Sequence, residues 1–319
     1  MGVPPHRRCT EHTAERRFPG SFPLQSGGIH GRGHTMTPFF SGTRPGTPVR
    51  HGTASFELPI LYRRDDAFAL FFTAKARAVA ALMPTPNLHP VRMPGGRALV
   101  GIAAFNYIDT SIGPYGEVAV VVPAVHGRRP LPVLPALMEA GYRGFGNLVL
   151  HLPVTGTEPR DAGRGVWGYT KFVADMRFAI GPEELVCRMD EEDEHILTLT
   201  VPRRGILRRD AKPLVTYSVL DGRLIQTVIP QRAIFHLGLR PRGASLELGG
   251  HQVARSIADL GLAPRPLMSR VYLFRPAILP AGEVVEEGVR PLDGYLGRDR
   301  TGIHEVHMSD GEAARSGES

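Results

Sequence analysis

The feature that most constrains the fold of this chain is a series of ten short apolar segments, separated by glycine, proline or acidic residues. Segments of this length with these boundaries are typical of β-strands. The predicted strands cover residues 98–107, 117–122, 147–152, 167–178, 185–190, 195–201, 214–220, 223–229, 244–248 and 270–274. Helices do not alternate with them in regular βαβ units, so we predict an α+β, mainly β fold whose antiparallel sheet is curled into a barrel or sandwich.

A few helices are expected outside this sheet. In residues 67–83 apolar side chains recur at third- and fourth-residue spacing, and the segment ends before Pro84. This pattern predicts an amphipathic helix, capped at its start by Asp65 or Asp66. A second helix is predicted over 133–142.

The two ends of the chain differ in composition from the middle. Residues 1–51 carry seven arginines against two carboxylates and show no hydrophobic period, which predicts a disordered basic arm with Met36 as an alternative start. Residues 288–319 are polar and acidic, and we expect a disordered tail there. One domain is therefore expected over 52–287. Because most of the excess positive charge lies in the arm and the arginine clusters lack interleaved aromatics, we expect no nucleic-acid partner.

The sequence also predicts the cellular compartment and whether a cofactor is needed. No apolar run approaches the roughly 20 residues of a membrane span, and the first residues lack the apolar centre of a secretory signal. Cys9 and Cys187 are too few for a disulfide framework, so we expect the reducing cytoplasm. The histidines and cysteines lack metal-ligand spacing, and we expect no metal and no cofactor.

Lysine is rare in this chain, since Lys75, Lys171 and Lys212 are the only lysines among 38 basic residues. An arginine stays protonated in proteins, whereas a buried lysine can lose its proton and act as a nucleophile. If 167–178 is a strand, Lys171 shares a face with Trp167 and Tyr169, and Phe172 lies on the opposite face. An interior Lys171 could form a Schiff base with a carbonyl substrate. The alternative is that Lys171 ends an edge strand and points to water.

Several segments resemble the acetoacetate decarboxylase family. The block GRGVWGYTK at 163–171 is similar to the family's Gly-Arg-Glu-x-x-x-Tyr-Pro-Lys-Lys block without a gap. Four other segments resemble family motifs in the right order: MPTP at 83–86, YGEVAVVVPA at 115–124, VTYSVLDGRLIQTVIP at 215–230 and AILPAGEVV at 277–285. The resemblance covers about residues 52–287.

The resemblance implies a cone-like β-barrel, a homo-oligomer and a Schiff-base lysine at Lys171. It also implies that Glu117 shuttles protons in the catalytic pocket. Tyr169 and Arg164 match further motif positions, and together with Trp167 and Phe172 they are the expected substrate-binding residues.

Three positions depart from the family pattern. The second lysine of the motif is Phe172, the glutamate after Gly-Arg is Gly165, and no arginine stands near 54–55, where the family's substrate-carboxylate arginine aligns. Bidentate arginine is the usual partner of a carboxylate. Either another arginine, Arg63 or Arg164, replaces it, or the substrate is larger and less anionic and lies against Trp167 and Phe172.

We therefore predict a lyase that decarboxylates a β-keto acid through an imine on Lys171, with a small oxo acid or ketone as substrate. Two alternatives remain open. One is an aldolase or dehydratase that acts on a 2-oxo acid with the same lysine. The other is a non-catalytic barrel that binds a small ligand, because fold does not fix function.

Overall fold

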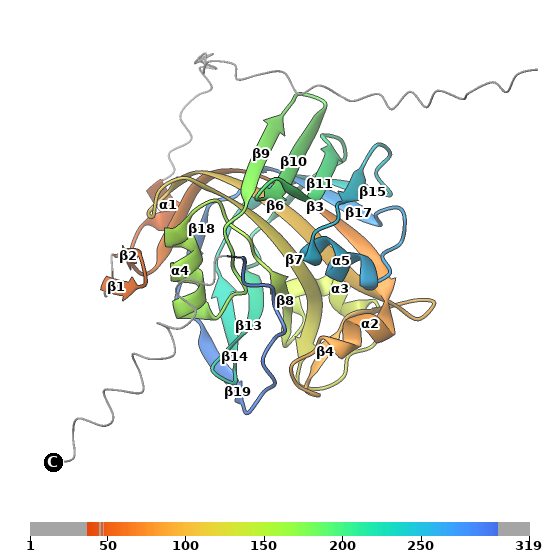
Figure 1. Ribbon diagram of the computed structural model, residues 1–319, viewed down its shortest axis with the longest axis horizontal. Coiled ribbons are helices and arrows are strands. Elements are labelled where there is room, and N and C mark those ends of the chain that lie inside the picture. Colours follow the sequence, from red (N-terminus) through yellow and green to blue (C-terminus); the bar gives the residue numbers. More distant parts are fainter. Residues whose placement is uncertain (1–36, 45, 47, 299–319) are drawn as a thin grey trace, which may run out of the picture. The chain divides into compact units, whose positions relative to one another are not determined.

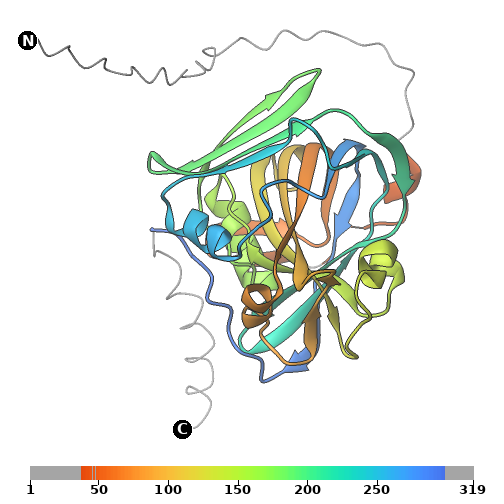
Figure 2. The same ribbon diagram turned by 90° about the vertical axis from the view of Figure 1, so that its right-hand side faces the viewer.

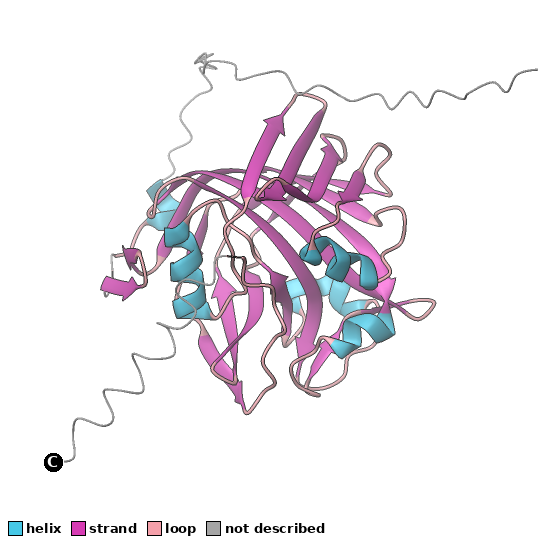
Figure 3. Cartoon of the chain, viewed as in Figure 1, coloured by secondary structure: helices cyan, strands magenta, loops and turns pink. Residues whose placement is uncertain are grey.

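Strands make up most of the structure, a computed structural model that describes residues 37–44, 46 and 48–298 (Figure 3). This confirms the mainly β prediction. From Phe39 onward the described residues form one compact unit. Its helical elements are α1 (Thr37–Phe40), which begins just before the unit, α2 (Ala76–Ala81), α3 (Leu134–Met138), the 3-10 helix η1 (Glu139–Gly141), α4 (Thr157–Trp167) and α5 (Gln252–Asp259).

A large sheet forms the centre of this unit, with its long strands β3, β6 and β7 side by side (Figures 1 and 2). Its strand order is β12 (Ile206–Asp210), β15 (Ala233–Leu239), β17 (Met268–Phe274), β3 (Ile60–Lys75), β6 (Arg97–Thr110), β7 (Tyr115–His126), β8 (Phe145–His151), β13 (Leu214–Leu220), β14 (Arg223–Ile229) and β19 (Glu283–Glu287). Three short strands pair beside this path: β18 (Ala277–Leu279) with β3, β4 (Leu88–Pro90) with β7, and β5 (Arg92–Met93) with β6. Neighbours on the path are antiparallel except β8 and β13, which run parallel.

Two smaller sheets accompany the large one. The first has the order β16 (Ser245–Leu248), β11 (Glu194–Pro202), β10 (Glu184–Glu191) and β9 (Asp175–Ile180), and the second is the hairpin of β1 (Pro48–His51) and β2 (Ala54–Glu57). In the described chain the path of the large sheet has two ends, β12 and β19, so the predicted closed barrel is not confirmed.

The two faces of the large sheet have different surroundings. Along β7, Val118, Val120 and Val122 are fully or almost fully buried in the main hydrophobic core. Side chains alternate along a strand, so the intervening residues, beginning with Glu117 and Ala119, face the other way. These residues line a large cavity. The sheet thus separates a packed core from a hollow.

The predicted helix over 67–83 was wrong for most of its length, because residues up to Lys75 belong to β3 and only Ala76–Ala81 are helical. The segment is apolar on both faces, so it fits helical spacing and a buried strand equally well. In the structure Phe68 and Leu70 face the core, while Phe71 faces the cavity. Pairing with β6 on one side and β17 on the other makes the segment a strand and not a helix.

The predicted strand over 167–178 was also wrong in its first half. Trp167 is the last residue of α4, and only β9 further on is a strand. Gly168 ends the helix in a left-handed conformation with φ of 65°, where its amide donates to Arg164 O and the next amide donates to Gly163 O. This is the common glycine C-cap of a helix.

The remaining sequence-based assignments agree with the structure. Each of the other nine predicted strands overlaps an observed strand, and the helix predicted over 133–142 is α3 followed by η1. No strand was predicted for β1, β2, β4, β5, β12, β15, β18 or β19, and no helix was predicted for α1, α4 or α5. None of the described helices is both long and apolar enough to cross a membrane. Cytoplasmic location and homo-oligomeric assembly stay predictions.

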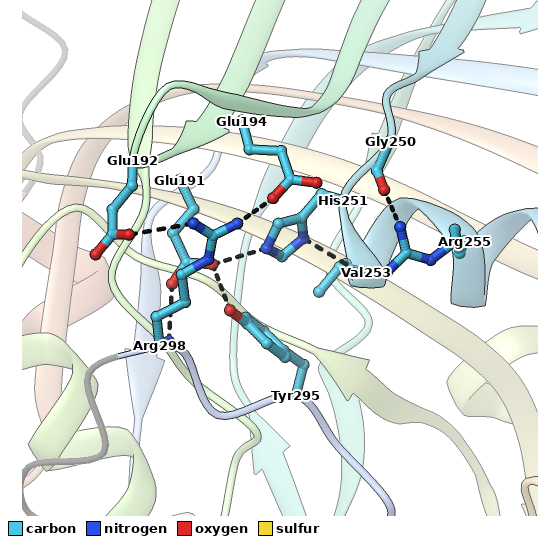
Figure 4. Close-up of polar contacts among 9 residues, drawn as sticks. All are labelled: Glu191, Glu192, Glu194, Gly250, His251, Val253, Arg255, Tyr295 and Arg298. Carbon is cyan, nitrogen blue, oxygen red and sulfur yellow. Dashed lines mark hydrogen bonds and ion pairs between the residues drawn. The ribbon is translucent and has the colours of Figure 1, made fainter.

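Both expected domain boundaries fall inside the described structure. Residues 48–51 of the expected arm form β1, and residues 288–298 of the expected tail pack on the unit. Figure 4 shows the contacts that hold the second segment, which converge on the carboxylate of Glu191. Glu191 accepts hydrogen bonds from Tyr295 Oη at 2.7 Å, His251 Nε2 at 2.8 Å and the Arg298 amide at 3.2 Å. Residues 1–36 and 299–319 lie outside the described residues.

A buried histidine at the end of β8 predicts how stability depends on pH. Burial lowers the pKa of His151 to about 4, with a further contribution from His251, whereas an unfolded chain titrates near 6.5. As pH falls from about 6.5 to 4, only the unfolded state gains this proton, so folding stability decreases. We expect wild type to lose roughly 2 kcal/mol more than His151→Gln between pH 7 and pH 4.5.

Urea unfolding at the two pH values measures this difference. His89→Gln is the matched control, because His89 is partly exposed and lies outside the core. Equal losses in wild type and His151→Gln would show that His151 does not carry the effect.

Candidate active site

A large cavity lies on the second face of the large sheet. It holds about 1550 Å³ of empty space, including the part that opens to solvent. Aliphatic and aromatic side chains from β3, β6, β7, β8 and β17 form most of its wall. A large, mainly apolar cavity with few polar groups is the usual form of a small-molecule site.

One buried ion pair lies in this wall. Lys171 Nζ is 2.6 Å from Glu117 Oε2, and the two residues are only 4% and 7% exposed. Glu117 comes from β7, whereas Lys171 follows α4, so two distant parts of the chain meet here. Of the two placements considered for Lys171, the structure has the interior one, and it adds the contact with Glu117.

Helix α4 and the loop after it fix the backbone of Lys171. Arg164 Nε donates to Lys171 O at 2.8 Å, and its Nη2 reaches both that carbonyl and Leu296 O. Arg164 is buried but is not among the residues that line the cavity. Its guanidinium thus bonds to the backbone behind the lysine, and the expected substrate contact of Arg164 stays a prediction.

Gly163 provides the space in which the lysine side chain lies. A Cβ added at Gly163 would overlap Lys171 Cε and Cδ, much closer than atoms can pack. The glycines of α4 weaken its helical signal, because glycine is unfavourable inside helices. Gly163 thus weakens the helical pattern of the sequence and also makes room for the side chain of Lys171.

Gly163→Ala tests this arrangement. Alanine suits a helix interior better than glycine, so the expected effect is on the lysine and not on helix formation. Displacement of a reacting group by about 1 Å can cost roughly a hundredfold in rate, and we expect a loss of that order in imine formation. The measurement is the rate of adduct trapping with a carbonyl compound.

Gly250→Ala is the matched control, because a Cβ there approaches nothing closer than 3.9 Å. Wild-type trapping by Gly163→Ala would show that the lysine does not depend on this space.

Three tyrosines surround the ion pair. Tyr107 Oη donates to Glu117 Oε1 at 3.3 Å, and the ring of Tyr115 lies 5.7 Å from Lys171 Nζ. The hydroxyls of Tyr62 and Tyr115 are 2.9 Å apart. Burial is the main cause that raises the pKa of all three phenols well above the usual value. They therefore stay protonated and serve as hydrogen-bond donors near neutral pH.

The aromatic residues around the lysine divide between the two sides of its segment. Trp167 and Tyr169 line the cavity, and their rings are stacked with centroids 6.1 Å apart. Phe172 is not among the residues that line it, and its expected substrate contact stays a prediction. Its ring is fully buried on the opposite side, 4.9 Å from the ring of Tyr295. The side chains of this extended loop thus alternate between its two sides, as was predicted for a strand at this position.

The arginines that line the cavity are not those suggested by the sequence. Arg63 is half-buried and pairs with Asp109 at 3.1 Å, outside the cavity. Arg270 and Arg275 do line it, and they pair with Glu139 and Asp65, respectively. No periodicity or motif marks these two arginines in the sequence. Both pairs come from segments far apart in the chain.

The described part of the chain contains no group of three or more His, Cys, Asp or Glu side chains that could hold a metal ion. The ionisable groups at the centre of the site are instead a lysine, a glutamate and tyrosines. This set is suited to covalent chemistry on a carbonyl with proton transfer.

Fold and site together define a β-rich protein in which a large apolar cavity holds a buried lysine–glutamate pair. The acetoacetate decarboxylase family model matches residues 46–287. The chain belongs to the acetoacetate decarboxylase family, whose members include enzymes. A comparison with curated proteins gave no significant match.

Solved structures show the same fold at low sequence identity. Acetoacetate decarboxylase from Legionella pneumophila is 19% identical with a TM-score of 0.57, over 78% of this chain and 94% of that one. An acetoacetate decarboxylase-like enzyme from Sphingomonas wittichii RW1 is 14% identical with a TM-score of 0.51, over 72% and 92%. The enduracididine biosynthesis enzyme MppR in complex with pyruvate is 12% identical with a TM-score of 0.51, over 76% and 99%.

Proposed function

We propose that this protein is a Schiff-base lyase that decarboxylates a 3-oxo acid through an imine on Lys171. The observation that carries the proposal is the contact of 2.6 Å between Lys171 Nζ and Glu117 Oε2 inside a large apolar cavity. An amine forms an imine only after it loses a proton, and the adjacent carboxylate is placed to accept one. Membership of the acetoacetate decarboxylase family supports this chemistry.

In the first half of the proposed reaction Lys171 becomes bonded to the substrate. Glu117 accepts one proton from the Lys171 ammonium, which frees the nitrogen lone pair. Nζ then bonds to the carbonyl carbon, and the carbonyl oxygen leaves as water with that proton and a second proton from Nζ. The product is a protonated imine, whose positive nitrogen attracts electrons from the neighbouring bonds.

In the second half the carboxylate leaves. The bond between the carboxylate and the adjacent carbon breaks, carbon dioxide departs, and the electron pair moves to the imine nitrogen to give an enamine. The enamine carbon takes one proton from solvent, which Glu117 is placed to deliver. Water then hydrolyses the imine, releasing a ketone and restoring Lys171. One solvent proton is consumed for each carbon dioxide released.

The same site supports a second reaction, aldol condensation or dehydration of a 2-oxo acid. One observation favours keeping it as the second candidate, since the related structure of MppR holds pyruvate.

Product analysis distinguishes these reactions. The protein is incubated with acetoacetate, with longer 3-oxo acids and with pyruvate plus an aldehyde, and carbon dioxide and condensation products are measured. We expect carbon dioxide and the corresponding ketone from at least one 3-oxo acid. Condensation or dehydration of pyruvate without carbon dioxide release would identify the second reaction, and no turnover of any compound would indicate a ligand-binding protein.

A further inference from the structure

We infer that the physiological substrate carries an extended apolar chain on its carbonyl carbon, which lies along the inner face of β3, β6 and β7. The carbonyl chemistry in this statement rests on the proposed function, whereas the apolar chain rests on the cavity alone. Four observations support an apolar chain on the substrate. They are the small side chains on one wall of the cavity, the length of that wall, the bonds that its polar residues already make to the protein, and the exposed apolar side chains beside the cavity.

A row of three alanines near Lys171 and Glu117 leaves extra space in the cavity wall, because their side chains are small. Ala69 of β3 pairs with Ala103 of β6, and Ala103 pairs with Ala119 of β7. All three side chains line the cavity. Ala119 lies two residues along β7 from Glu117, about 7 Å away at the usual rise of a strand. Small side chains on three neighbouring strands leave room directly beside the reacting nitrogen.

The cavity continues beyond this row. Along β7, Val121 and Pro123 also line it, so its wall extends over six residues from Glu117, or about 20 Å. Phe71, Leu99 and Phe145 line it at the same end. Acetoacetate is much shorter than this wall, whereas an extended alkyl chain can follow the strand direction.

The polar lining residues at this end are already engaged by the protein. Glu139 pairs with Arg270. Asn147 Nδ2 donates to Val215 O at 3.1 Å, and Lys212 Nζ donates to Met138 O at 3.1 Å. Groups that already bond to the protein do not require a polar ligand, and at this end only Arg270 Nε is a buried nitrogen of the described lining without a hydrogen-bond partner. The chain attached to the carbonyl is therefore expected to be apolar.

The segment that borders the cavity at Ala136 and Ala140 also exposes apolar side chains. Leu137 is 74% exposed and Met138 is 40% exposed. Both belong to α3, which lies directly before Glu139 of the lining. Exposed apolar side chains beside the cavity are consistent with an apolar ligand.

Alcohols that cannot form imines test the chain without the chemistry. Burial of each methylene group strengthens binding about fourfold. We therefore expect wild type to bind 2-decanol at least about a hundredfold more tightly than 2-butanol, as measured by calorimetry. Equal affinities for the two alcohols would overturn the inference.

Ala103→Phe fills the middle of the alanine row and should reduce this preference at least about tenfold, while Ala258→Phe, on the exposed face of α5, keeps it. If Ala103→Phe does not fold, Ala119→Leu fills the same row with a smaller side chain. An unchanged preference in a folded row variant would contradict the assignment of the chain to this path.

The two proposals fail separately in this design. 2-Decanol has no carbonyl, so its binding does not depend on Lys171 chemistry. Loss of the imine with retained alcohol preference would refute the lyase and leave the apolar path, and the reverse result would refute the path and leave the lyase. With 3-oxodecanoate and acetoacetate as substrates, kcat/KM is expected to favour the longer acid at least about tenfold.

Discussion

Lys171→Arg is expected to reduce 3-oxo acid turnover by a factor on the order of 10³ or more, about 4 kcal/mol of transition-state stabilisation. Arginine keeps the positive charge opposite Glu117, so the buried carboxylate is not left unpaired. Its guanidinium stays protonated and cannot form an imine. The measurement is kcat for carbon dioxide release from the best 3-oxo acid.

Lys75→Arg is the matched control, because Lys75 is exposed and does not line the cavity. Thermal unfolding of both variants shows whether they are folded. Because arginine is larger than lysine and the space beside Gly163 is narrow, the double variant Lys171→Met/Glu117→Gln provides a second test that removes both charges together. Turnover at the wild-type rate in either Lys171 variant would exclude the imine mechanism.

Glu117→Gln is expected to lower turnover by about 10² to 10⁴, the usual contribution of a general acid or base. The amide keeps the size of the side chain and the hydrogen bond to Tyr107, but it cannot accept the proton from Lys171. Once formed, an imine should still be trapped by borohydride in this variant. The expected signature is therefore slow turnover together with a detectable adduct.

Glu184→Gln on the exposed start of β10 is the control for this substitution. Wild-type turnover in Glu117→Gln would remove Glu117 from the proton-transfer steps. Loss of the adduct with a folded protein would instead show that Glu117 is required for imine formation itself.

The lysine and the glutamate could be found from the sequence because a motif in register marks both of them. Their contact could not be found, since it joins β7 to the loop after α4 across 54 residues of sequence. Arg275 and Asp65 illustrate the same limit more strongly. They pair inside the fold, yet the local pattern assigned Asp65 to the cap of a helix that does not form.

Both errors in secondary structure arise where local signals and tertiary demands differ. β3 is apolar on both faces because one face meets the core and the other meets a cavity, so period and burial could not distinguish strand from helix. α4 was missed because Gly163 and Gly165 weaken a helical pattern. Their Cβ positions are taken by Lys171 and His51, respectively. Sites and cavities are where such local inconsistencies are expected.

Borohydride reduction in the presence of carbonyl substrates, followed by peptide mass analysis, tests the central claim most directly. The protein is incubated with acetoacetate, 3-oxodecanoate and pyruvate in separate reactions. We expect at least one substrate to give a single reduced adduct on the peptide that contains Lys171, with none on Lys75 or Lys212. No adduct with any of the three compounds, or equal labelling of all three lysines, would contradict a Schiff base at Lys171.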